Sequence, residues 1–135
     1  MSHPSRVGLV DTSVFIAMES GRPLDAGAVP TELAASVVTL AELTVGVLAA
    51  GDLSTRATRL ATLARVRSFD LLPVTDGVAA HWARLRVQVA QSTRRVNIND
   101  LWIAATAAAH GLPVVTQDAD FDVRAEVGGI EVIRV

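Results

Sequence analysis

Short apolar segments alternate with longer amphipathic or apolar segments along the chain. The short ones predict five strands, at about residues 7–10, 35–39, 69–74, 113–116 and 130–135. The segments between them predict helices, at about residues 12–18, 40–51, 54–66, 76–91 and 99–110. Short apolar strands separated by helices are typical of a parallel sheet that is covered on both faces. The pattern therefore predicts an α/β fold around a five-stranded parallel sheet.

Small polar residues and one glycine predict where three of these helices begin or end. Ser54 and Thr75 are suited to cap the third and fourth helices. Asn97 or Asn99 can cap the last helix, and Gly111 follows it as a C-terminal stop.

Five carboxylates stand where the predicted strands end. Asp11 directly follows the first strand, Glu42 comes three residues after the second, and Asp118 and Asp120 follow the fourth. Asp100 begins the helix that leads into the fourth strand, so this helix should run antiparallel to the strands. Ligands of open parallel sheets bind at the carboxyl edge. We expect all five acids to gather at that edge.

Each acid also has a purely structural explanation. Asp11 could cap the helix that follows it, and Glu42 fits a Thr-x-x-Glu capping box from Thr39. Asp100 in a first helical turn suits the helix dipole, and residues 117–122 could form an ordinary acidic turn. These explanations do not account for the acids as a group, because gathered like charges repel one another.

The basic residues and possible metal ligands favour a cation at this edge. All twelve basic residues are arginine, so no lysine can neutralise the acids. Carboxylate oxygens suit Mg²⁺ or Mn²⁺. Zinc is disfavoured, because cysteine is absent and the three histidines are not spaced as ligands. A metal held in this way can activate a water molecule for attack on a phosphoryl group. The residues therefore point to metal-dependent phosphoryl chemistry.

Composition adds expectations about organisation and location. We expect the 135 residues to form a single domain, residues 1–135. Half of the residues are hydrophobic and the mean hydropathy is +0.40, so a second copy or a partner should cover some apolar surface. No apolar run is long enough to span a membrane, and the start of the chain does not look like a signal peptide. We therefore expect a cytoplasmic protein without a membrane partner.

Four segments of the sequence resemble the PIN-domain ribonucleases, and within them the VapC toxins of bacterial toxin–antitoxin modules. The matching segments are "VGLVDTSVFIA", "TLAEL", "NINDLWIAATAAAHGLPVVTQDADFD" and the final "IEVIRV". In order, they extend over nearly the whole chain. The third is the most specific.

The resemblance implies a set of site residues. The catalytic acids would be Asp11, Glu42, Asp100 and Asp118. The metal ligands would be Asp11, Asp100, Asp118 and, as a possible further ligand, Asp120. The residues that help to order the site would be Thr12, Ser13, Asn99 and Thr116.

The resemblance also implies fold, activity and partners. The family has a three-layer α/β/α sandwich and uses Mg²⁺ or Mn²⁺ to cut single-stranded or looped RNA. Its toxins form homodimers and are silenced by a cognate VapB-type antitoxin that wraps over the early helices. The apolar helices at about residues 31–66 would suit that role.

Arg94 and Arg95 lie just before Asp100 and could contact RNA phosphates, or they could belong to a solvated loop. A net charge of −2 gives the chain no general affinity for nucleic acid, so RNA binding would depend on such local arginines.

Other metal-dependent classes fit less well. Haloacid-dehalogenase-like phosphatases and response-regulator receivers need a lysine, which this chain lacks. Structure-specific DNA nucleases usually carry extra helical elements. A PIN-like module that binds RNA or a partner without cutting is the main alternative, but clustered carboxylates would repel a polyanion.

Overall fold

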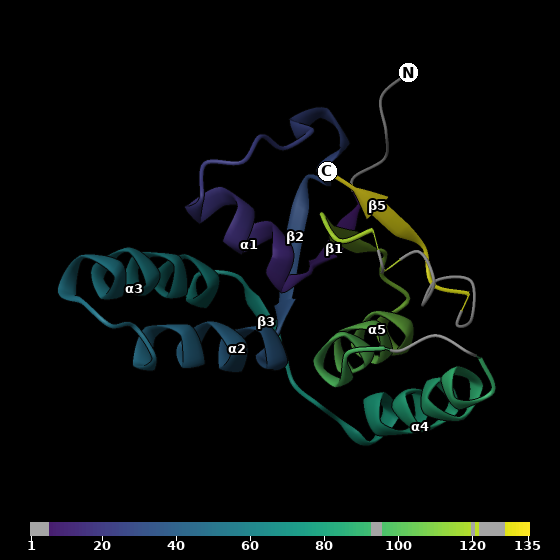
Figure 1. The fold of residues 1–135 in the computed structure, drawn as a ribbon. Helices are drawn as coiled ribbons and strands as arrows, with labels where there is room; N and C mark the ends of the chain where they lie inside the picture. The colour runs from purple at the N-terminus through teal and green to yellow at the C-terminus, as the bar shows by residue number, and fades with distance from the viewer. Residues whose placement is uncertain (1–5, 93–95, 120, 122–128) are drawn as a thin grey trace.

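A five-stranded, entirely parallel sheet forms the centre of the computed structural model, which describes residues 6–92, 96–119, 121 and 129–135. The strands are ordered β3-β2-β1-β4-β5 (Figure 1). Their bounds are β1 Val7–Val10, β2 Glu32–Ser36, β3 Asp70–Leu72, β4 Val114–Thr116 and β5 Val132–Arg134. The predicted α/β class and five-stranded parallel sheet are confirmed.

Five α-helices and one short 3₁₀ helix accompany the sheet in the part of the chain that the structure describes. Their bounds are α1 Thr12–Glu19, η1 Ala26–Ala28, α2 Val37–Leu48, α3 Leu53–Arg67, α4 Asp76–Ala90 and α5 Ile98–His110. Figure 1 shows α4 and α5 together on one side of the sheet, with α3 on the other.

Two apolar cores explain why the molecule has three layers. Neighbouring strand residues point to opposite faces of a sheet. Leu9 and Val114 therefore join the core beneath α4 and α5, whereas Val10 and Val115 join the core beneath α1 and α3. All four are essentially inaccessible to solvent. The expected α/β/α sandwich is thus confirmed.

The second strand lies at Glu32–Ser36, so it both begins and ends three residues earlier than the predicted 35–39. The β-branched residues Val37, Val38 and Thr39 favour extended backbone through residue 39. Instead β2 ends at Ser36, whose Oγ accepts a hydrogen bond from the backbone N–H of Val38 at 3.0 Å and caps α2. Thr39 therefore lies inside the helix, and the suggested capping box between Thr39 and Glu42 is wrong.

The other helix ends follow the sequence more closely. Thr75 caps α4 and Asn97 caps α5, and Gly111 ends α5 in the left-handed conformation with a φ of 63°. The prediction for α3 was wrong by two residues, because Asp52 rather than Ser54 caps this helix by accepting from the backbone N–H of Thr55.

In the described ranges, no helix is long and apolar enough to cross a membrane.

Candidate active site

Asp11 is a buried carboxylate at the carboxyl end of β1. It is only 2% exposed. Its Oδ2 accepts hydrogen bonds from Ser13 Oγ at 2.7 Å and from Thr116 Oγ1 at 2.9 Å. Asp11 occupies the N-cap position of α1, but its side chain makes no capping hydrogen bond. No capping bond of normal geometry therefore supports the capping explanation of Asp11.

The other oxygen of Asp11 is left unsatisfied. Oδ1 is buried and has no hydrogen-bond partner among the described residues. Burial raises the pKa of Asp11 above its usual 3.8. The hydroxyls of Ser13 and Thr116 and the backbone N–H of Ser13 oppose this rise, and the charge of Asp118 adds to it. An unpaired carboxylate oxygen in a buried position is costly unless it meets a proton or a cation. Asp11 is thus suited to bind a cation through Oδ1.

The segment after β4 is tied to Asp11 through Thr116. The Thr116 hydroxyl that donates to Asp11 also accepts the backbone N–H of Asp118 at 2.9 Å. The backbone N–H of Gln117 donates to Ser13 Oγ at 3.0 Å. These bonds bring Asp118 to the carboxyl edge beside Asp11, as its position directly after the fourth predicted strand indicated.

Gln117 also fixes this segment from its other side. Its amide Nε2 donates to the carbonyls of Pro23 and Val135, at 3.0 and 2.9 Å. The sequence pattern did not identify Gln117 as a site residue. Its position between Thr116 and Asp118 was the available signal.

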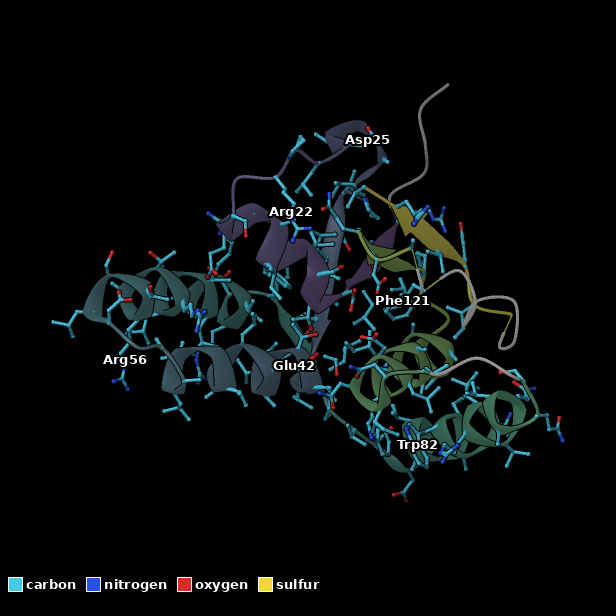
Figure 2. All side chains as sticks on the ribbon, viewed as in Figure 1. Arg22, Asp25, Glu42, Arg56, Trp82 and Phe121 are labelled. Carbon is cyan, nitrogen blue, oxygen red and sulfur yellow. The ribbon has the colours of Figure 1, made fainter. Side chains whose placement is uncertain are left out.

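Glu42 reaches the same edge from α2. It lies in the second turn of this helix (Figure 2) and is half-buried. The hydroxyl of Thr12 donates to Glu42 Oε1 at 2.8 Å and lies 3.0 Å from the hydroxyl of buried Thr39. Thr12 thus links the start of α1 to Glu42. Thr39, which the sequence suggested as a cap, supports this link.

Asp100 lies in the first turn of α5. Asn97 Oδ1 accepts the backbone N–H groups of Asn99 and Asp100, at 2.8 and 3.4 Å, so the helix start is fixed without the Asp100 carboxylate. This end of α5 lies beside the start of α2 (Figure 1). Asp100 is half-buried there and Asn99 is exposed.

The donor set fits a hydrated divalent cation better than a fully protein-coordinated one. Within the described residues, no three Asp, Glu or His side chains stand close enough together to hold a metal ion jointly. Mg²⁺ is commonly bound through one or two carboxylates and keeps several waters. The free Oδ1 of Asp11, with Asp118 nearby, matches that demand. Three predicted site residues, Asp120, Arg94 and Arg95, lie outside the described residues.

Comparisons with known proteins agree with this architecture. A family model described as "PIN domain" matches residues 8–127. The chain is 56% identical to "Ribonuclease VapC5" of Mycobacterium tuberculosis over the full length of both proteins. It is 42% identical to "Ribonuclease VapC4" of the same organism, covering 96% of this chain and 98% of that protein. A crystal structure of VapBC-5 from M. tuberculosis, a member of the VapBC family of toxin–antitoxin systems, contains a chain with a TM-score of 0.88 and 54% identity. The match covers 98% of this chain and 100% of that one.

Proposed function

The chain belongs to the PIN domain family, and we propose that it is a metal-dependent endoribonuclease that acts as the toxin of a toxin–antitoxin pair. The observation that carries this proposal is the unpaired, buried Oδ1 of Asp11 at the carboxyl edge of the sheet. We also propose that residues 1–135 act as one PIN domain and that RNA is cut in the cytoplasm.

The proposed cofactor is Mg²⁺, with Mn²⁺ as a substitute. Asp11 and Asp118 would hold the ion directly, with Asp100 and Asp120 as further ligands, partly through water. When bound, such an ion lowers the pKa of a water ligand and stabilises charge on a phosphoryl oxygen.

The residues of this chain prepare that site. Ser13 and Thr116 hold the Asp11 carboxylate by its Oδ2, which leaves Oδ1 free of both hydroxyls. Thr12 fixes one oxygen of Glu42, so the other remains available to accept a proton from an attacking water or to orient it. We propose Asp11, Glu42, Asp100 and Asp118 as the catalytic acids, with Asn99 as a supporting residue beside Asp100.

The proposed partner is a VapB-type antitoxin, as in the similar VapBC-5 pair. Large apolar side chains are exposed on α2 and α3: Val45, Leu48, Leu53 and Leu60. Exposed apolar surface of this kind favours a protein partner. We propose that this surface contacts the antitoxin and that the toxin also forms a homodimer.

Purified protein should therefore cut total cellular RNA in Mg²⁺ or Mn²⁺. We expect discrete cuts that disappear with EDTA and with Asp100→Asn, a change that removes one charge but leaves the Asn97 cap intact. The cut ends would identify the target RNA. If the protein neither cuts RNA nor binds Mg²⁺ in calorimetry, the proposal is wrong and a non-catalytic binding module takes its place.

A further inference from the structure

A hollow of about 500 Å³ lies between α2 and α5, directly beside Glu42. Side chains from both helices line it: Val37, Val38, Ala41, Glu42 and Val45 from α2, and Asn99 and Trp102 from α5. The hollow therefore shares Glu42 and Asn99 with the proposed active site. Whatever occupies it would lie next to the reacting groups.

Helical spacing explains why polar and apolar side chains line the hollow together. Val38, Ala41, Glu42 and Val45 stand at positions i, i+3, i+4 and i+7, so they share one face of α2. Asn99 and Trp102 are three residues apart and share one face of α5. The hollow thus combines an indole and aliphatic groups with one amide and one carboxylate.

Trp102 is held in place before any ligand arrives. Its ring stacks on that of Trp82 from α4, with centroids 4.7 Å apart and an interplanar angle of 16°. Figure 2 labels Trp82 on α4, which packs against α5. Because the indole is already ordered, a ligand that contacts it does not have to immobilise it.

These features suit a flat, unpaired nucleobase. Proteins recognise single-stranded RNA by stacking bases on aromatic side chains and by hydrogen bonds to base edges. Trp102 supplies the aromatic ring, and the exposed Asn99 amide supplies both a donor and an acceptor. Because Glu42 lines the hollow, a base bound there would lie beside the proposed active site. The antitoxin surface proposed above shares Val45 with the hollow, whereas the Asn99 amide and the Trp102 ring lie outside that surface.

We propose that the hollow between α2 and α5 seats one unpaired base of the RNA, in contact with Trp102 and beside the scissile phosphate. This inference rests on the proposed ribonuclease function. It adds that the enzyme selects RNA in which a base beside the cut is unpaired. Trp102 and Asn99 are then specificity-determining residues.

Intrinsic fluorescence tests the contact without cleavage. Trp82 and Trp102 are the only two tryptophans. In an Asp100→Asn background, short oligouridylate and oligoadenylate chains should quench the fluorescence of Trp82→Phe, which retains Trp102. They should not quench Trp102→Phe, which retains Trp82. Equal quenching in both variants, or RNA binding by filter assay with no quenching in either, would overturn the inference.

A substitution that fills the hollow tests the same point in the active enzyme. Ala41→Phe adds a ring in the hollow without removing the Trp82–Trp102 stack, and we expect it to raise KM for RNA by roughly ten-fold or more. Ala57→Phe on exposed α3 is the matched control and should leave KM unchanged. An RNA with an abasic nucleotide beside the cut should raise the KM of the wild type by a similar factor. It should raise the KM of Ala41→Phe little further.

The outcomes separate the two proposals. If the wild type cuts no RNA at all, the ribonuclease function fails. If the wild type cuts RNA and Ala41→Phe has the same KM, only the base-binding inference fails. If Ala41→Phe weakens binding of a VapB-type antitoxin but leaves KM for RNA unchanged, the hollow belongs to the protein interface and the inference is wrong.

Discussion

The hydroxyl of Thr116 donates a hydrogen bond to Oδ2 of Asp11 at 2.9 Å and joins two residues that are 105 positions apart in the chain. The same hydroxyl accepts the backbone N–H of Asp118 at 2.9 Å. One side chain thus orients the buried acid of β1 and the segment that carries the acid after β4.

Thr116→Val should weaken both metal binding and RNA cleavage, by about 10- to 100-fold, the usual cost of losing a group that orients a metal ligand. The Thr116 hydrogen bond lowers the pKa of Asp11, so its loss should raise that pKa further. A proton then competes better with the metal, and the acidic limb of the pH–rate profile should move to higher pH. Thr116→Ser keeps the hydroxyl and serves as the control; a profile that is identical for Val and Ser would contradict this role.

Asp11→Asn should abolish cleavage yet stabilise the metal-free protein at neutral pH. Because burial raises the pKa of Asp11, the folded protein binds more protons than the unfolded chain between 3.8 and the raised pKa. The contribution of the Asp11 carboxyl to stability is therefore fully present below pH 3.8. It is lost as the pH rises through the raised pKa of the folded state. We expect Asp11→Asn to melt about 3–5 °C above the wild type in EDTA at pH 7, the shift that about 1 kcal/mol produces in a protein of this size.

Thermal melts at several pH values check this prediction. The difference between Asp11→Asn and the wild type should shrink as the pH approaches 3.8, where the wild-type carboxyl becomes protonated in both states. Added Mg²⁺ should raise the melting temperature of the wild type but not that of Asp11→Asn. A variant that melts below the wild type at pH 7 in EDTA would show that the Asp11 carboxylate stabilises the fold.

Thr12 and Glu42 should behave as one unit. Thr12 Oγ1 lies 2.8 Å from Glu42 Oε1, and Thr12→Val removes the hydroxyl while keeping a β-branched side chain. In a double-mutant cycle with Glu42→Gln, we expect a coupling free energy of about 1 kcal/mol in the activation free energy for RNA cleavage. Thr12→Ser should retain most activity. Strictly additive effects of Thr12→Val and Glu42→Gln would mean that the hydrogen bond does not contribute to catalysis.

Gly8 in β1 has no room for a side chain. A Cβ at this position would lie 2.6 Å from Val115 Cγ2 and 2.8 Å from Pro30 Cγ. Gly8→Ala should therefore lower the free energy of unfolding by about 1–3 kcal/mol in urea titrations. A Cβ at Gly51 would have no neighbouring atom within 4 Å, so Gly51→Ala should be neutral or stabilise by about 0.4–1 kcal/mol. Equal stability of the two variants would rule out the close approach at Gly8.

The sequence by itself determined the layered α/β fold and the edge at which Asp11, Asp118 and Asp100 stand. Periodic apolar segments specify strands and helices locally, and parallel connections then bring every strand end to one side. Thr75, Asn97 and Gly111 also act on backbone groups within a few residues, so their roles followed from local sequence.

Only the tertiary structure decided how the site is held together. Ser36 rather than Thr39 caps α2, because packing of β2 and α2 sets where extended backbone gives way to helix despite the β-branched residues there. The unpaired Oδ1 of Asp11 depends on which oxygen the Ser13 and Thr116 hydroxyls select. The hollow beside Trp102 exists because α2 and α5, which come from different parts of the chain, lie side by side. Such contacts join residues far apart in sequence, and no local pattern encodes their geometry.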